Sequence, residues 1–263
     1  MESIATDDSI VRFFMQHVVA LNVAYDPPDG RPRQRNAFTC FPFELAGDWY
    51  LVTAGHILEN LYSALPKCRN VECSLFDAWQ EKAHKLPVPF PLLGADHIAI
   101  DRDGLDLGLV SLPPLVRSLL QANGIRAFEE VAWRHLPTGM VHHALVGLPD
   151  QFSRQGTGPE GSVTLSVSPT LVYLRTVPPP PDMAKSFPCF YGKLAGSLRN
   201  PHSGATLEHM VGFSGSPIVG FHFSDAGQIK YFLVAVQSAW RPDLRVVVGP
   251  LISAVVALLE PKP

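Results

Sequence analysis

The sequence predicts an all-β protein, folded either as an antiparallel sandwich or as barrels. Ten short apolar or alternating runs, enriched in Val, Leu, Phe and Tyr, are bounded by turn residues. The 263-residue chain also contains 25 prolines and 20 glycines, and both residue types interrupt helices and favour turns. Many short strands with few helices are therefore expected.

The predicted strands are spread over most of the chain. They cover residues 18–23, 37–44, 49–52, 107–112, 142–146, 162–166, 170–174, 216–223, 231–237 and 245–248. Three short helices are predicted: residues 10–17, residues 116–122 after a Pro-Pro pair, and residues 251–259 after Pro250. The stretch 120–134 fits either a further helical segment or a long loop.

The composition excludes several classes of protein. Apolar residues make up 46% of the chain and charged residues 17%, against about 25% charged residues in an average globular domain. The chain is therefore not intrinsically disordered. The formal net charge is −3, and no basic stripe is present to bind phosphates, so a nucleic-acid partner is not expected.

Export and membrane insertion are not expected either. The N-terminus is acidic, whereas a signal peptide begins with basic residues. The most apolar stretch, residues 246–259, is interrupted by Gly249 and Pro250 and is shorter than the roughly 20 residues that a spanning helix needs. Four cysteines, at positions 40, 68, 73 and 189, are sparse for this length. We expect reduced thiols and a cytoplasmic location.

Three segments combine the residue types of nucleophilic catalysis. Residues 49–58 read WYLVTAGHIL, so an apolar strand ends in small residues that let His56 leave it at a fixed angle. Residues 211–219 read VGFSGSPIV and place Ser214 among glycines, which let backbone N–H groups converge on one point. Residues 105–112 read LDLGLVSL and place Asp106 at the head of an apolar strand, where a shielded carboxylate can orient a histidine. The aspartates at positions 96, 101 and 103 are assigned to a solvated loop.

These segments resemble the motifs of trypsin-like, chymotrypsin-fold serine peptidases. That family has Thr-Ala-Ala/Gly-His around its base, Asp-Leu/Ile-Ala-Leu around its acid and Gly-Asp/Asn-Ser-Gly-Gly/Ser-Pro around its nucleophile. The chain order also matches, because His56, Asp106 and Ser214 follow one another at intervals of 50 and 108 residues. The resemblance covers almost the whole chain and is nearest to bacterial, non-secreted members.

The resemblance implies two six-stranded antiparallel β-barrels with a short C-terminal helix. Residues 1–135 would form the barrel that carries His56 and Asp106. Residues 136–263 would form the barrel that carries Ser214, and the two would make one integrated peptidase unit.

The resemblance also implies a role for each residue. Ser214 would attack the peptide carbonyl, His56 would take its proton and pass it to the leaving amine, and Asp106 would hold the imidazole in the required tautomer. The N–H groups of Gly212 and Ser214 would bind the oxyanion. No metal and no organic cofactor are required. The expected activity is that of a serine endopeptidase acting on protein or peptide substrates through an acyl-enzyme.

One departure from the family pattern bears on activation. Phe213 replaces the Asp that pairs with a newly cut N-terminus in secreted zymogens, which argues against activation by N-terminal cleavage. Nothing in the sequence visibly locks the oxyanion loop in its place. Residues 35–43 also lack the Gly-Thr-Gly-Phe of many relatives. We expect the enzyme to be restrained either by a protein partner that activates or inhibits it or by a narrow choice of substrate.

A substrate pocket follows from the resemblance as well. Glu208, six residues before Ser214, takes the position at the pocket base, where an acid favours a basic side chain at the cleavage point. Ser238, Ala239 and Trp240 would form the wall, and Trp240 is large enough to narrow the pocket. The alternative is that Glu208 is a solvated loop residue.

Other site chemistries fit less well. His142 and His143 are adjacent in a predicted strand and point to opposite faces. The two cysteines at positions 68 and 73 lack a second ligand pair at zinc-site spacing. An α/β-hydrolase needs the order Ser, acid, His, but only His222 follows Ser214.

Two functional alternatives remain beside constitutive proteolysis. A catalytically silent trypsin-like fold would serve as a protein-binding module, although the presence of all three catalytic residue types argues against it. A peptidase held inactive by a collapsed oxyanion loop until a partner binds is the second alternative. By analogy with stand-alone bacterial relatives that occur beside sensor or defence proteins, the peptidase is also a candidate bacterial defence effector.

Overall fold

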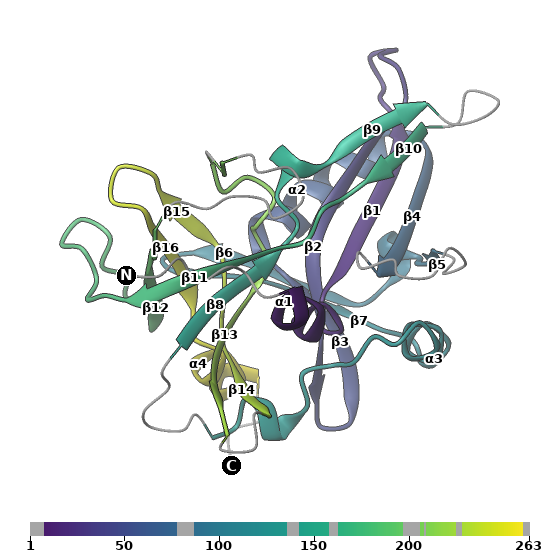
Figure 1. Ribbon diagram of the computed structural model, residues 1–263. Helices are drawn as coiled ribbons and strands as arrows, with labels where there is room; N and C mark the ends of the chain where they lie inside the picture. The colour runs from purple at the N-terminus through teal and green to yellow at the C-terminus, as the bar shows by residue number, and fades with distance from the viewer. Residues whose placement is uncertain are drawn as a thin grey trace.

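A computed structural model of the chain describes residues 8–77, 87–135, 142–157, 163–196, 206–207, 209–224 and 228–259. Two seven-stranded antiparallel sheets dominate the described residues (Figure 1). The all-β fold class and the C-terminal helix are confirmed, and each sheet has one strand more than the six expected.

The first sheet has the order β5-β4-β1-β2-β3-β7-β6. Its strands are β1 (Val19–Asp26), β2 (Gln34–Leu45), β3 (Asp48–Thr53), β4 (Arg69–Asp77), β5 (Val88–Pro89), β6 (His97–Arg102) and β7 (Leu105–Ser111). In this sheet β1 and β7 are mostly apolar and buried, as expected for strands that are covered on both faces.

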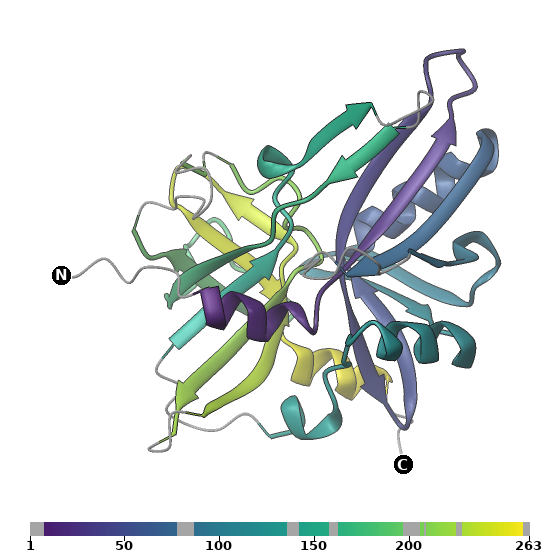
Figure 2. The same ribbon diagram turned by 45° about the vertical axis from the view of Figure 1, so that its right-hand side comes forward.

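The second sheet has the order β14-β13-β8-β11-β12-β16-β15. Its strands are β8 (His142–Gly147), β11 (Thr170–Thr176), β12 (Cys189–Leu194), β13 (Pro217–Phe223), β14 (Ile229–Val236), β15 (Ala239–Arg241) and β16 (Val246–Pro250). A separate hairpin pairs β9 (Arg154–Thr157) with β10 (Val163–Ser166) and extends toward β1 and β2 of the first sheet (Figures 1 and 2).

Four α-helices accompany the sheets: α1 (Asp8–Met15), α2 (Gly55–Ala64), α3 (Pro114–Ala122) and α4 (Ile252–Leu259). All ten predicted strands and three of these helices are confirmed. The sequence did not indicate α2, because Ala54 stands at its N-cap and no side chain caps the helix. In the stretch 120–134, only the end of α3 and a single 3₁₀ turn at Glu130–Ala132 are helical.

One expectation about the aspartates was wrong. Asp101 does not lie in a solvated loop but in β6, directly opposite Asp106 of β7 in the antiparallel register. The strand is mostly exposed, so its apolar alternation is too weak to mark it as a strand in the sequence.

A shared core joins the two sheets. The helix α1 leads into β1 of the first sheet, yet it lies against the second (Figure 2). The ring of Phe14 in α1 is edge-on to that of Phe221, with 5.4 Å between the ring centroids. One buried cluster contains Phe41 from the first sheet and Val219 from the second. The division into residues 1–135 and 136–263 stays a prediction, and the two parts share this core.

The sheets approach most closely at the turn before β13. A Cβ on Gly215 would lie 2.2 Å from Oγ1 of Thr53 and 2.6 Å from the carbonyl oxygen of Thr39. The backbone of Gly215 also has a φ of +86°, a region that side chains disfavour. Glycine is therefore needed here for the second sheet to meet the first.

Two further expectations concern the thiols and the membrane. The four cysteines all lie in the described residues and are free thiols, as predicted. No helix in the described ranges has the length and apolar character needed to cross a bilayer.

Candidate active site

The position of His56 is set by the start of α2, immediately after β3. A Cβ on Gly55 would lie 2.0 Å from the carbonyl oxygen of Ile100, so only glycine allows the first helical turn to rest against β6. The backbone N–H of His56 donates to Oδ1 of Asp106 at 2.9 Å, and its Nδ1 lies 2.7 Å from Oδ2 of the same carboxylate. One carboxylate thus satisfies an unpaired amide of the helix start and orients the imidazole.

The surroundings of Asp106 shield it from solvent. The residue is 8% exposed and stands in β7 between the buried side chains of Leu105 and Leu107. As predicted, it lies next to apolar strand residues. A carboxylate in this position is screened little by water, so its interaction with His56 is stronger than that of an exposed pair.

The electrostatic environment raises the pKa of His56 above its ordinary value of 6.5. The main cause is the hydrogen bond to Asp106, partial burial opposes it, and the charges of Asp106, Asp101 and Glu59 add to the rise. A neutral imidazole accepts a proton, whereas a protonated one donates it, so these carboxylates favour the state that follows proton uptake.

Polar atoms of His56, Asp101 and Asp106 lie within 4.8 Å of one another, a spacing that also suits a cation. Asp106 already binds the backbone and the ring of His56. We therefore interpret the group as charge support for a protonated imidazole.

Ser214 lies in a tight turn before β13. The N–H of Gly215 donates to the carbonyl of Gln237 at 2.8 Å, and the N–H of Ser216 donates to the carbonyl of Phe213 at 2.8 Å. Phe213 is fully buried in an apolar cluster with Met210 and packs near Trp240. The buried side chain of Phe213 thus anchors this loop, for which the sequence indicated no lock.

Thr39 of β2 links the two sheets behind this turn. Its Oγ1 donates to the carbonyl of Gly212 at 2.7 Å and accepts from the N–H of Leu148 at 3.0 Å. The carbonyl of Val211 accepts from the N–H of Asp150 at 3.0 Å. The carbonyl groups of Val211 and Gly212, which lie on either side of the Gly212 amide nitrogen, are therefore held in defined directions.

The two amides assigned to the oxyanion have no competing partner. Within the described residues, neither the N–H of Gly212 nor that of Ser214 donates to a protein acceptor. Because N–H and C=O point in opposite directions across a trans peptide, the bond from Val211 to Asp150 also sets the direction of the Gly212 amide. Their role as an oxyanion hole stays a prediction, and this geometry supports it.

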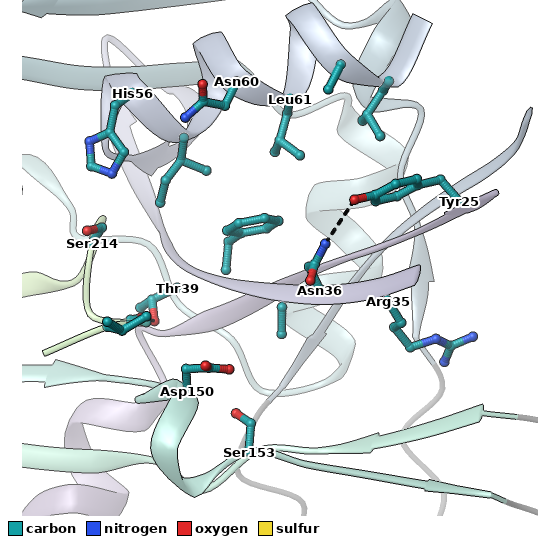
Figure 3. A pocket seen from close by; sticks show the side chains of 17 residues that line it. Tyr25, Arg35, Asn36, Thr39, His56, Asn60, Leu61, Asp150, Ser153 and Ser214 are labelled. Atoms are coloured by element: carbon teal, nitrogen blue, oxygen red, sulfur yellow. Dashed lines mark hydrogen bonds between the residues drawn. The ribbon is translucent and has the colours of Figure 1, made fainter. Parts of the chain in front are cut away.

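His56 and Ser214 line the same cavity, which has a volume of about 700 Å³. Figure 3 shows the imidazole and the Ser214 side chain one above the other at one end of it. The helix α2 forms one wall and β2 the other. The structure therefore brings His56, with its Asp106 partner, and Ser214 to the same cavity from the two different sheets.

The structure describes three of the four residues that were predicted to form the substrate pocket. Glu208 lies outside the described residues. Ser238 directs both its N–H and its hydroxyl to the carbonyl of Val248, while Ala239 and Trp240 belong to β15. None of these three lines the cavity beside His56, so their role in substrate binding stays a prediction.

Two residues at the site were not identified from the sequence. Thr39 contacts a glycine 173 positions away, and no local pattern signals such a contact. Asp101 carried only a weak signal, because residues 97–101 read HIAID, a run of three apolar residues between two polar ones.

We predict that Thr39 positions the turn that carries Ser214. In Thr39→Val the Gly212 carbonyl and the Leu148 amide lose their partner, which costs about 1–3 kcal/mol for each buried group. We expect kcat of a cleavable ester to fall about ten- to hundredfold with KM little changed, which is less than the 10²–10³ for removal of an oxyanion donor. Steady-state kinetics measures both values. Thr39→Ser keeps the hydroxyl and should restore kcat, whereas equal losses in both variants would contradict the prediction.

Comparisons with known proteins agree with the fold. No family model matches the sequence, and no curated protein matches it. Among solved structures, the thermostable serine protease AL20 from an extremophilic microorganism is similar over 91% of this chain and 93% of its own, with 13% identity and a TM-score of 0.50. The protease Anisep from Arthrobacter nicotinovorans matches over 92% and 93%, with 13% identity and a TM-score of 0.49. At 13% identity the likeness to the AL20 protease shows the fold alone, which is the two-barrel fold of chymotrypsin-like proteases.

Proposed function

We propose that this protein is a serine endopeptidase that hydrolyses protein or peptide substrates through an acyl-enzyme. The observation that carries the proposal is the single Asp106 carboxylate, which binds both the amide and the imidazole of His56 beside a cavity that also contains Ser214. A histidine held in this way presents its other ring nitrogen to a substrate or nucleophile.

In the proposed reaction, His56 removes the proton of Ser214 as its oxygen attacks the scissile carbonyl. The resulting oxyanion is bound by the N–H groups of Gly212 and Ser214. His56 then delivers the proton to the leaving amine, and water hydrolyses the acyl-enzyme by the same route. Asp106 stabilises the protonated imidazole in both halves of the reaction.

The anchored turn supports a site that is formed without a partner. Phe213 is buried and Gly212 is held through Thr39, so the loop has internal contacts in place of the family's charged pair. Regulation by a partner, a bacterial source, a cytoplasmic location and a defence role stay predictions from the resemblance.

A fluorophosphonate probe tests the proposal, because it labels only an activated serine. At alkaline pH, which favours the neutral imidazole that can accept a proton, we expect stoichiometric labelling of the wild-type chain. Ser214→Ala and His56→Ala should each abolish it. Ser216→Ala is the matched control, since this buried hydroxyl has no hydrogen-bond partner among the described residues and its loss should leave labelling intact.

The outcomes separate the peptidase from its rival. Labelling that requires both His56 and Ser214 supports the peptidase. A folded wild-type chain that stays unlabelled, alone and with candidate partners, would favour the catalytically silent binding module.

A further inference from the structure

The cavity beside Ser214 continues well beyond the reacting groups. From His56 it follows one face of α2, where Ile57, Asn60, Leu61 and Ala64 line it. These positions repeat at the three- and four-residue spacing that places side chains on one side of a helix. Figure 3 shows His56, Asn60 and Leu61 along this wall, facing residues of β2.

The position of His56 indicates which part of a substrate enters this space. In acyl transfer the histidine gives its proton to the leaving amine, so the leaving group departs on the histidine side of Ser214. Because the cavity begins at His56 and extends along α2, the chain that follows the cleaved bond is directed into it.

The lining suggests what kind of side chain fits. Ile57 and Leu61 are 7% and 6% exposed and belong to an apolar cluster, against which Phe38 of β2 packs from the other side. The amides of Asn36 and Asn60 lie on exposed residues of the two walls, where they can bind the polar backbone of a peptide. Apolar walls with a few polar groups are typical of binding sites.

The volume sets the size of the occupant. The cavity of about 700 Å³ is in the upper half of the range of roughly 300–1,000 Å³ found for ligand pockets. It therefore has room for a large side chain together with neighbouring backbone.

We propose that this cavity binds a bulky apolar residue on the C-terminal side of the cleaved bond, and that the enzyme selects its substrates there. The inference rests on the proposed peptidase function. It places selectivity along α2, at a site formed by residues other than Ser238, Ala239 and Trp240.

Capture of an acyl-enzyme by added amines tests this directly. The chain is acylated with p-nitrophenyl acetate, so that the acyl group is small and constant. An amino-acid amide then competes with water: its nitrogen attacks the acyl carbonyl, its proton passes through His56 to the Ser214 oxygen as the ester bond breaks, and an acetylated amide is released. The ratio of the acetylated amino-acid amide to free acetate measures how well the added amide binds on the leaving-group side.

We expect leucinamide and phenylalaninamide to capture the acyl group about ten- to hundredfold better than glycinamide, the effect of burying one large apolar side chain. Aspartic acid amide should capture no better than glycinamide. The readout is a ratio within one sample and does not depend on the overall rate.

Two variants on neighbouring helix positions localise the effect. Ala64 and Ser63 are both exposed, but only Ala64 lines the cavity. Ala64→Arg should reduce the preference for leucinamide over glycinamide at least threefold, while Ser63→Arg should keep the wild-type ratio.

The possible results distinguish the two proposals. Equal capture of all amides by an acyl-enzyme that forms normally overturns this inference and leaves the peptidase intact. An equal loss of preference in both arginine variants also overturns it. If no acyl-enzyme forms and no probe labels Ser214, the peptidase proposal fails and the inference fails with it.

Discussion

Replacement of Asp106 by asparagine is expected to lower kcat about 10⁴-fold with little change in the fold. The substitution keeps the size of the side chain and removes one acceptor. The expected loss of kcat arises because an asparagine at this position would place the ring proton of His56 on the wrong nitrogen.

The backbone of His56 determines how an asparagine would sit. Its N–H is a donor and now binds Oδ1 of Asp106 at 2.9 Å, so the amide oxygen of the asparagine must take that place. The amide NH₂ then faces Nδ1, where Oδ2 now lies at 2.7 Å. Because an NH₂ group only donates, Nδ1 must become the acceptor and the proton moves to Nε2. A histidine protonated on that nitrogen cannot take the proton of Ser214.

Single-turnover acylation by an active ester measures the effect. Asp101→Asn is the matched control, because Asp101 lies opposite Asp106 on the neighbouring strand and contributes charge near the ring, whereas Asp106 is the carboxylate that hydrogen-bonds to the ring. We expect less than a tenfold change in that variant. Equal losses in both variants would show that charge, and not the tautomer, is what Asp106 contributes.

The second large effect concerns stability in acid. His17 is 1% exposed, and burial lowers its pKa from 6.5 to about 4. Its Nδ1 must donate to the carbonyl of Arg126 at 2.9 Å, because that oxygen can only accept. Its Nε2 therefore accepts from the hydroxyl of Tyr231 at 2.8 Å. The ring also stacks on Phe128 at 4.4 Å.

The sign of the effect follows from proton binding. The folded-state pKa is lower than the unfolded one, so between about pH 6.5 and pH 4 the unfolded chain binds a proton that the folded chain does not. The free energy of unfolding therefore decreases as the pH falls through this window. The difference between the two pKa values of His17 corresponds to about 3 kcal/mol in the free energy of unfolding. This stability is fully present at neutral pH.

Urea unfolding of the wild type and of His17→Gln, each at pH 7 and pH 4, measures this contribution. Glutamine has a donor for Arg126 and an acceptor for Tyr231 and does not titrate. We expect the wild type to lose about 3 kcal/mol more than the variant between the two pH values. All other titrating groups are shared by the two chains, so equal losses would rule out His17 as the cause.

Local sequence patterns determined much of the fold. The apolar and alternating runs indicated ten strands, and the prolines indicated the starts of α3 and α4. The segments around His56, Asp106 and Ser214 were recognised because a strand end, a tight turn and a strand start each need particular residues at consecutive positions. Such requirements act over a few residues and are visible in one sequence.

Weaker local signals were missed for the same reason. The helix α2 lacks a capping side chain, and β6 is too exposed to show a clear alternation. Both elements gain their stability from packing against each other, as the close approach of Gly55 to Ile100 shows. Tertiary packing of this kind overrides weak propensity.

Contacts between the sheets were decided only by the tertiary structure. The bond of Thr39 to Gly212 and the pairing of His17 with Tyr231 each join residues that are far apart in the chain. The cavity along α2 likewise exists only because β2, α2 and the turn before β13 meet. These features depend on how two twisted sheets are placed against each other, and that placement is set by the summed packing of the shared core. No short stretch of sequence carries that information.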